Sequence, residues 1–370
     1  MDLCDTPTPS LVLDAARLRA NCAFMAGRAA ALGVKLRPHL KTAKCAEVAR
    51  LATAGQFGGI TVSTPLEAEW FAARGFGDIT LAVGVTAERL TRLLPLTRGT
   101  RLTVITDSLP VARCLPALAA RAHQPLRVLI EVDCGDRRAG VAPDSRELLH
   151  IAEALGPACE GVLTHAGHSY RAGSVEAIRA IAEQERAAAV LAAERLRAAG
   201  FAARTVSVGS TPTCTHAASL QGVTEMRPGV YMFGDLEQAG IASLPEDRIA
   251  LSVLTTVLGV YPDQNKLIVD AGGLALSKDV AAQRLGGNWG YGRVLDVEGR
   301  PLGRARVFAC SQEHGQITDD APLPAITVGS RLRIVPNHVC MTVAAHPGYH
   351  VVEGSTQVEG FWPRVNGWSA

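Results

Sequence analysis

A basic segment at the end of a short predicted strand contains the lysine best suited to covalent chemistry. Residues 37–44 read Arg-Pro-His-Leu-Lys-Thr-Ala-Lys and follow the start of a strand at residues 33–36. Because side chains alternate along a strand, four basic groups would converge on one face, those of Lys35, Arg37, His39 and Lys41. Their mutual repulsion favours a neutral amine, the form of lysine that attacks a carbonyl carbon to give a Schiff base. The chain has only five lysines, and we predict Lys41 as the catalytic one.

Two turns rich in glycine and hydroxyl groups follow predicted strands and could bind an anion. Residues 209–213 read Gly-Ser-Thr-Pro-Thr and offer N–H groups and hydroxyls, for which phosphate is the natural ligand. The same segment could instead only cap the helix that follows it. At the next strand end, residues 227–231 read Arg-Pro-Gly-Val-Tyr, and Gly229 lets the backbone approach a ligand closely. On successive strand ends the two turns would form one phosphate site.

Two further turns contain ionisable side chains. Residues 164–170 place the imidazoles of His165 and His168 and the phenol of Tyr170 at one strand end, although either imidazole could be a structural polar group. Residues 133–140 read Asp-Cys-Gly-Asp-Arg-Arg-Ala-Gly and include Arg138, but they could equally form a charged surface loop. The sequence leaves both alternatives open for each turn.

A His-x-Cys pair near the C-terminus has the ligand chemistry of a metal site. His338 and Cys340 are two residues apart, and on a strand their side chains would point to the same face. Imidazole and thiolate suit zinc better than magnesium. Two protein ligands leave coordination positions for water or substrate, as in catalytic zinc sites. The neighbouring His314 and His346 are expected to be surface or structural residues.

Predicted strands alternate with predicted helices through the first two thirds of the chain. The strand candidates are residues 35–39, 59–63, 78–83, 101–106, 126–133, 161–165, 205–209 and 223–227. Stretches rich in Ala, Leu, Glu and Arg separate nearly every pair, which predicts an α/β protein with a closed parallel (β/α)8 barrel. An open doubly wound sheet is the alternative, although no GxGxxG motif follows the first strand. The polar turns described above lie at strand carboxyl ends, where barrel enzymes place their chemistry.

The pattern changes after about residue 244, where β-branched segments alternate with Gly, Pro and Asn turns and helical stretches are few. This change predicts a second, all-β domain at the C-terminus, which the strand at residues 10–13 would join. We therefore expect residues 15–244 to form the barrel, and residues 1–14 with 245–370 to form the β domain.

Composition excludes several other classes of protein. The chain is 48% hydrophobic and 19% charged with a net charge of +2, and its basic residues are dispersed and its aromatic residues few, which argues against nucleic-acid binding. No apolar run approaches the roughly 20 residues of a membrane span. The nine cysteines lack a framework spacing and indicate reduced thiols, and the first residues lack the features of a signal peptide. We therefore expect a cytoplasmic protein.

Five sequence blocks resemble the D-threonine aldolase and D-serine dehydratase family, the metal-dependent branch of the alanine racemase-like pyridoxal phosphate enzymes. The blocks are Arg-Pro-His-x-Lys-Thr-x-Lys at 37–44, Gly-Ile-Thr-Val-Ser-Thr at 59–64, Thr-His-Ala-Gly at 164–167, Val-Ser-Val-Gly-Ser-Thr-Pro-Thr at 206–213 and Pro-Asn-His-x-Cys at 336–340. The first and last are the specific ones. The resemblance implies a (β/α)8 barrel that binds the cofactor, a β domain that binds the metal, and a homodimer.

The resemblance also implies roles for individual residues. Lys41 matches the lysine that holds pyridoxal phosphate, and Arg138 matches an arginine near the phenolic oxygen of that cofactor. The role of Arg227 varies within the metal-dependent branch, and His338 and Cys340 match the metal pair. Phosphate-binding positions and segments that line the cofactor match Gly209, Ser210, Thr211, Gly229, Val230, His165, Tyr170 and Tyr231.

The implied reaction is a dehydration of D-3-hydroxyamino acids, either D-serine, D-threo-3-hydroxyaspartate or D-threonine, to a 2-keto acid and ammonia. Cysteine at position 340 favours the dehydratases, because the aldolase members usually have aspartate there. Zinc is the expected metal, with manganese and magnesium as alternatives. The nearest alternative function is a retro-aldol cleavage to glycine and an aldehyde, followed by an amino acid racemase and, outside enzymes, a pyridoxal phosphate carrier. The expected partners are a small D-amino acid and a second copy of the chain, with neither nucleic acid nor membrane.

Overall fold

The computed structural model describes residues 1–285 and 287–368, which form two compact units. The first, here called the β unit, contains Met1–Ala23 and Val230–Asn366. The second, the barrel unit, contains Phe24–Gly229, and residues 367 and 368 are assigned to it. The domain boundaries expected from the sequence, at 14/15 and 244/245, follow a change of residue pattern and stay a prediction.

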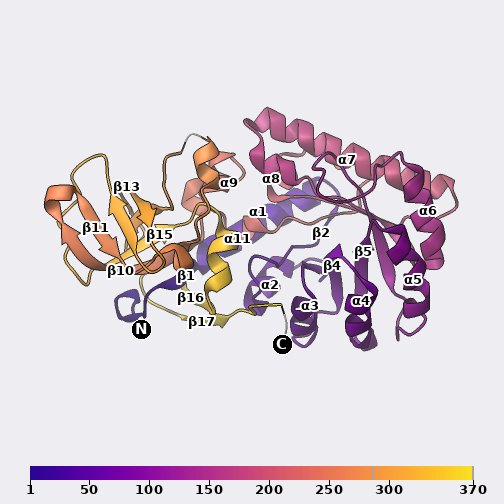
Figure 1. Cartoon of the computed structure of the whole chain (residues 1–370), viewed down its shortest axis with the longest axis horizontal. Helices are drawn as coiled ribbons and strands as arrows, with labels where there is room; N and C mark the ends of the chain where they lie inside the picture. Colours follow the sequence, from indigo (N-terminus) through magenta and orange to yellow (C-terminus); the bar gives the residue numbers. More distant parts are fainter. Residues whose placement is uncertain (286, 369–370) are drawn as a thin grey trace. The chain divides into compact units, whose positions relative to one another are not determined.

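Eight parallel strands form the sheet of the barrel unit, in the order β2-β9-β8-β7-β6-β5-β4-β3. Strands β2, β4 and β5 of this sheet are labelled in Figure 1. They are β2 (Lys35–Leu36), β3 (Ile60–Val62), β4 (Asp78–Gly84), β5 (Arg101–Thr106), β6 (Arg127–Glu131), β7 (Cys159–Leu163), β8 (Thr205–Val208) and β9 (Glu225–Met226). A parallel bridge between His39 and Thr61 joins the segment after β2 to β3, which closes the sheet. The predicted (β/α)8 barrel is therefore confirmed.

Helices follow the strands in the expected alternation. They are α1 (Ala15–Ala31), whose residues divide between the two units, and α2 (Ala46–Thr53), α3 (Pro65–Ala72), α4 (Ala87–Leu93), α5 (Leu109–Ala119), α6 (Arg146–Leu155), α7 (Val175–Ala198) and α8 (Thr211–His216). Their start points follow from local sequence, because hydroxyl side chains such as those of Thr64 and Ser174 accept a hydrogen bond from the N–H three residues later. Val and Ile side chains of the strands fill the interior.

Nine strands form the sheet of the β unit, in the order β11-β14-β13-β12-β15-β10-β1-β16-β17. They are β1 (Ser10–Asp14), β10 (Leu251–Tyr261), β11 (Lys266–Val269), β12 (Arg293–Asp296), β13 (Pro301–Cys310), β14 (Gly315–Thr318), β15 (Arg331–Val335), β16 (Gly348–Val352) and β17 (Gly360–Pro363). An additional pairing of β11 with β10 makes part of this sheet a ring, and among its described strands only β1 and β16 pair in parallel. The C-terminal all-β prediction is confirmed, and the N-terminal strand β1 joins this sheet.

Three short helices also belong to the β unit, α9 (Leu236–Gly240), α10 (Gly273–Leu276) and α11 (Val339–Thr342). Among the described residues, no helix has the length and apolar composition needed to cross a bilayer.

Candidate active site

A cavity of about 300 Å³ lies within the barrel unit and contains the predicted lysine. Its lining comes from the ends of the strands and the turns that follow them: His39, Lys41, Ser63, Ala82, Val83, Gly84, Glu131, Arg138, Ala139, Leu163, His165, Gly209 and Arg227. Of the residues predicted for the site, four line this cavity, namely Lys41, Arg138, His165 and Gly209.

The turn after β2 presents Lys41 to the cavity. The N–H of His39 donates to the carbonyl of Pro228 at 2.9 Å, and the N–H of Leu40 donates to that of Thr61 at 2.8 Å. These bonds fasten the turn to β3 and to the segment after β9, and the N–H of Lys41 donates to Nδ1 of His39 at 3.3 Å. Lys41 is an exposed residue, and no other lysine appears among the described residues that line the cavity.

The expectation that four basic groups converge beside Lys41 is wrong. Lys35 and Arg37 line a different cavity of about 340 Å³. Alternation does not by itself bring the groups together, because a strand rises about 3.3 Å per residue and Arg37 and Lys41 are four positions apart. Pro38 also follows directly on the two-residue strand β2.

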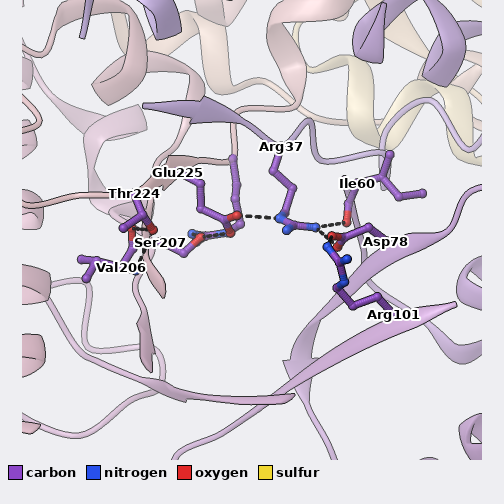
Figure 2. A network of polar contacts seen from close by, with 9 residues as sticks. Arg37, Ile60, Asp78, Arg101, Val206, Ser207, Thr224 and Glu225 are labelled. Carbon is purple, nitrogen blue, oxygen red and sulfur yellow. Dashed lines mark hydrogen bonds and ion pairs between the residues drawn. The ribbon is translucent and has the colours of Figure 1, made fainter. Parts of the chain in front are cut away.

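The guanidinium of Arg37 is held in a buried network (Figure 2). Its Nε donates to Oε2 of Glu225 at 2.8 Å, and Nη1 donates to Oδ1 of Asp78 at 2.6 Å. Glu225 also accepts from the hydroxyl of Ser207 at 2.6 Å, and Asp78 accepts from Arg101 at 3.1 Å. Figure 2 shows Arg37 between the two carboxylates, so β2 is braced to β9 on one side and to β4 on the other.

Two imidazoles line the cavity, and both are neutral near neutral pH. Burial, assisted by the nearby charge of Lys41, lowers the pKa of His165 to about 3. The same two causes lower the pKa of His39 well below its ordinary value. Nδ1 of His165 lies 3.1 Å from the carbonyl oxygen of Gly209, so in the neutral ring Nδ1 donates and Nε2 is an acceptor. His39 has the opposite tautomer, because its Nδ1 accepts from Lys41.

Arg138 reaches the cavity from a turn that its own residues shape. Oδ1 of Asp133 accepts from the N–H groups of Gly135 and Arg137 at 2.8 and 3.0 Å, which folds the turn back on itself. The Arg138 guanidinium lies 3.6 Å from Glu131, whose pKa is raised by burial although Arg138 opposes the rise. Arg138 lines the cavity although its side chain is 56% exposed, so the role expected for it stays a prediction.

The predicted phosphate turn is built around α8. Ser210 caps the helix in a capping box with Thr213, and Ser210 and Thr211 are buried. Gly209 has a φ of +119°, and a Cβ there would lie 2.6 Å from the sulfur of Cys214. A Cβ at Gly229 would lie 2.7 Å from the carbonyl oxygen of His39, in the turn that leads to Lys41. Both glycines therefore allow close packing of the turns that surround the cavity.

Three further residues predicted for the cofactor site, Tyr170, Val230 and Tyr231, are not among the described residues that line the cavity. Tyr170 belongs to a short 3-10 helix, η4 (Gly167–Arg171), in the barrel unit. Val230 and Tyr231 are buried in the 3-10 helix η5 (Val230–Met232) of the β unit. Arg227 does line the cavity, where its guanidinium donates to the hydroxyl of Ser207 at 2.6 Å and to the carbonyl of Thr164 at 2.5 Å.

A cluster of potential metal ligands lies in the β unit around His338. Nδ1 of His338 is 3.1 Å from Oδ2 of Asp235 and 3.0 Å from Oε2 of Glu237. Ligand atoms of these three residues lie within 4.8 Å of one another. Burial alone would lower the pKa of His338, but Cys340, Asp235 and Glu237 raise it well above the ordinary value. The cluster therefore favours a positive charge, which a metal ion would supply.

The strand geometry expected for the His-x-Cys pair is wrong. Strand β15 ends at Val335, His338 is the N-cap of α11 and Cys340 lies in the first turn of that helix. Cys340 nevertheless interacts with the His338 ring, because among the groups that raise the pKa of that ring Cys340 has the largest effect. His346 is buried, with Nε2 2.9 Å from the carbonyl oxygen of Ala275, in agreement with a structural role.

Sequence reasoning missed Glu131, Asp235 and Glu237. Glu131 ends β6 two residues before Asp133, and strand alternation could have placed both on one face. Asp235 and Glu237 form an Asp-x-Glu pair more than a hundred residues before His338, and only the fold of the β unit brings them to the histidine.

Comparison with known proteins identifies both parts of the chain. A family described as alanine racemase, N-terminal domain, matches residues 13–237, and a putative serine dehydratase domain matches residues 250–352. The D-threo-3-hydroxyaspartate dehydratase of Delftia sp. (strain HT23) is 44% identical, with 98% of each chain covered. The D-serine dehydratase of Dictyostelium discoideum is 32% identical with 96% of each covered, and the D-threonine aldolase of Arthrobacter sp is 31% identical with 96% and 91% covered.

A solved structure matches the whole chain. It is a D-threo-3-hydroxyaspartate dehydratase with a cysteine-to-alanine mutation, in the metal-free form, and it superposes with a TM-score of 0.94 at 42% identity, with 100% of each chain covered. This chain therefore belongs to the family of D-serine dehydratases and D-threonine aldolases, built from an alanine racemase N-terminal domain and a serine dehydratase domain.

Proposed function

We propose that this protein is a pyridoxal phosphate- and metal-dependent dehydratase that converts a D-3-hydroxyamino acid to a 2-keto acid and ammonia. The observation that carries the proposal is the exposed residue Lys41 in a cavity of about 300 Å³ that two arginines also line. The names of the two dehydratase relatives support D-threo-3-hydroxyaspartate and D-serine as the substrates to test first.

The residues of the cavity fit pyridoxal phosphate. Lys41 would supply the primary amine that holds the aldehyde, and Arg138 would supply a cation for the phenolic oxygen. Ser210 and Thr211 are the proposed phosphate-binding residues, on the turn whose first residue, Gly209, lines the cavity. When bound, the cofactor supplies an electron sink for the carbanion that forms at the substrate α-carbon.

Lys41 is then the proposed base. Its Nζ would take the α-proton from one face of the substrate, and a single base on one face selects one enantiomer. Arg138 is kept close to Glu131 by the 3.6 Å ion pair, which limits where its cation can lie. The neutral ring of His165 adds no positive charge that would compete with the cations for an anionic substrate.

His338 and Cys340 are the proposed metal ligands, and the chemistry of the cluster fits zinc. Asp235 and Glu237 lie beside Nδ1 of His338, so we propose that they orient the imidazole and leave Nε2 for the metal. When bound, the metal acts as a Lewis acid that lets the β-hydroxyl depart as hydroxide.

Product analysis tests the reaction. Metal-replete enzyme is incubated with D-serine, D-threonine and D-threo-3-hydroxyaspartate, before and after chelation. Keto acid and ammonia, lost with the metal and restored by zinc or manganese, are expected. Glycine and an aldehyde would assign the retro-aldol reaction instead, and turnover that ignores chelation would refute the metal role.

The cofactor lysine has its own test with a matched control. Lys41→Ala should lose the visible absorbance band that pyridoxal phosphate shows when it is bound to a lysine. Lys44→Ala should keep the band, because Lys44 lies three residues on and is paired with Glu67 at 3.1 Å. If the band persisted in Lys41→Ala, Lys41 would not be the lysine that holds the cofactor.

A homodimer and a cytoplasmic location complete the proposal. The nine cysteines, all within the described residues, form no disulfide, which supports a reducing compartment. Sedimentation analysis of the purified protein tests the dimer.

A further inference from the structure

The carboxylate of Glu185 lies buried between two turns that contribute residues to the cavity. Glu185 is in α7 and only 2% exposed. Its Oε1 accepts from the N–H of Ala166 at 2.8 Å and from the N–H of Gly209 at 3.0 Å. A further hydrogen bond joins the carboxylate to the side chain of Thr213. One oxygen atom therefore connects the turn after β7 to the turn after β8.

Both turns contribute to the proposed cofactor site. Ala166 directly follows His165, and Gly209 lines the cavity beside that ring. Two other bonds cross between the same turns, from Nδ1 of His165 to the carbonyl of Gly209 at 3.1 Å and between the hydroxyls of Ser169 and Ser210 at 2.9 Å. These two hydrogen bonds keep their lengths only when the backbones of the two turns stay a fixed distance apart. Glu185 sets that distance.

The shared oxygen has no simple replacement. The N–H groups of Ala166 and Gly209 are both directed at Oε1, and buried N–H groups that lack an acceptor force the backbone to rearrange. A rearrangement would move Gly209 and the hydroxyl residues after it, and these are the residues proposed to bind phosphate. Glu185 belongs to neither turn, so it acts on the site only through them.

We propose that Glu185 is a positioning residue of the cofactor site, whose carboxylate oxygen holds the turns after β7 and β8 in the arrangement that binds the phosphate group. This inference rests on the proposed function. It requires a hydrogen-bond acceptor at this point and not a negative charge. Glutamine keeps the acceptor and the length of the side chain, whereas aspartate keeps the charge but is one methylene shorter.

The test compares Glu185→Gln, Glu185→Asp and Glu185→Met with the wild-type protein. The dissociation constants of pyridoxal phosphate and of pyridoxal, which lacks the phosphate, are measured by absorbance titration of cofactor-free protein. We expect Glu185→Gln to stay within about threefold of wild type for both ligands. Glu185→Asp and Glu185→Met should raise the dissociation constant of pyridoxal phosphate at least about tenfold and that of pyridoxal much less.

A buried carboxylate elsewhere in the barrel unit controls for lost stability. Asp78 bonds to Arg37 and Arg101 and does not line the cavity. Asp78→Asn should lower the melting temperature of the cofactor-free protein and leave both dissociation constants unchanged.

Each outcome decides the proposal. Equal pyridoxal phosphate affinity in wild type and all three Glu185 variants would overturn the positioning role alone, as would equal weakening of both ligands. If Glu185→Gln bound pyridoxal phosphate more weakly than Glu185→Asp, the charge of the side chain would matter more than its position, and the proposal would also be overturned. If Glu185→Met does not fold, the order of the other two variants still decides. Failure of the wild-type protein to bind pyridoxal phosphate would instead refute the proposed function.

Discussion

Replacement of Arg37 by methionine should destabilise the barrel unit strongly without altering the chemistry at Lys41. The guanidinium makes two close ion pairs, 2.8 Å to Glu225 and 2.6 Å to Asp78, and all three side chains are largely buried. Methionine preserves most of the volume but leaves two buried carboxylates without this cation. The strand that leads to Lys41 thereby loses the brace that joins it to β9 and β4.

The magnitude follows from what each carboxylate keeps. Removal of one partner of a buried ion pair costs about 3–5 kcal/mol. Glu225 retains the hydroxyl of Ser207 at 2.6 Å, and Asp78 retains Arg101 at 3.1 Å, so we expect the lower end, about 3 kcal/mol. For a unit of this size that loss lowers the melting temperature by roughly 6–12 °C. The turn with Lys41 keeps its own backbone bonds to Thr61 and Pro228, so affinity for pyridoxal phosphate should change little.

The assay is thermal unfolding followed by circular dichroism, with two comparison variants. Arg204→Met breaks an exposed pair, with Arg204 69% exposed and 3.2 Å from Glu160, and should cost less than about 1 kcal/mol. The double variant Arg37→Met/Glu225→Gln removes the uncompensated charge as well and should recover about 1 kcal/mol or more. A fall in melting temperature for Arg37→Met no larger than for Arg204→Met would refute the reasoning, as would a double variant less stable than Arg37→Met.

Three further predictions concern the metal, acid stability and packing. Cys340→Ala should abolish stoichiometric zinc in elemental analysis, whereas Cys310→Ala, a half-buried thiol of the same unit, should retain it. Because the pKa of His165 is lowered to about 3, the unfolded chain binds a proton between about pH 6.5 and that value while the folded chain does not, so stability falls as the pH falls. His165→Gln should therefore reduce the loss in urea midpoint between about pH 7 and pH 5. A loss as large as that of the wild-type protein would contradict the lowered pKa. Gly229→Ala, whose Cβ would lie 2.7 Å from a carbonyl oxygen, should weaken pyridoxal phosphate binding, and Gly99→Ala, with open space around its Cβ, should not.

The fold was largely predictable because its pattern is local and repeated. Parallel strands buried by flanking helices read as short apolar runs separated by helical stretches, and that alternation gave the barrel. Strand ends were less predictable: β2 covers only Lys35–Leu36, whereas the expected strand continued to residue 39. The residues from Arg37 to His39 still bond to neighbouring strands, but Pro38 has no N–H to continue the ladder.

The site was predictable where one segment carries its own chemistry. Lys41 and the His-x-Cys pair are conspicuous by residue type and spacing alone. Glu185 was not, because it is one glutamate among the many polar residues of a long helix, and only the fold turns its carboxylate toward Ala166 and Gly209. Asp235 and Glu237 were missed for the same reason, since their partner His338 is distant in sequence.

The protonation states of the cavity favour a lyase over a racemase. A racemase needs a second base that faces the opposite side of the α-carbon and has a pKa near the working pH. Burial and the charge of Lys41 lower the pKa of both His165 and His39, to about 3 for His165, so each ring is a poor proton acceptor. Glu131, whose pKa is raised by burial, is paired with Arg138 at 3.6 Å, and Lys41 has the one primary amine among the described lining residues of the cavity. A single base removes the α-proton from one face and returns it to that face or not at all. If solvent deuterium entered the α-position of recovered D-substrate without any L-enantiomer, that would support this single-base argument, and formation of the L-enantiomer would refute it.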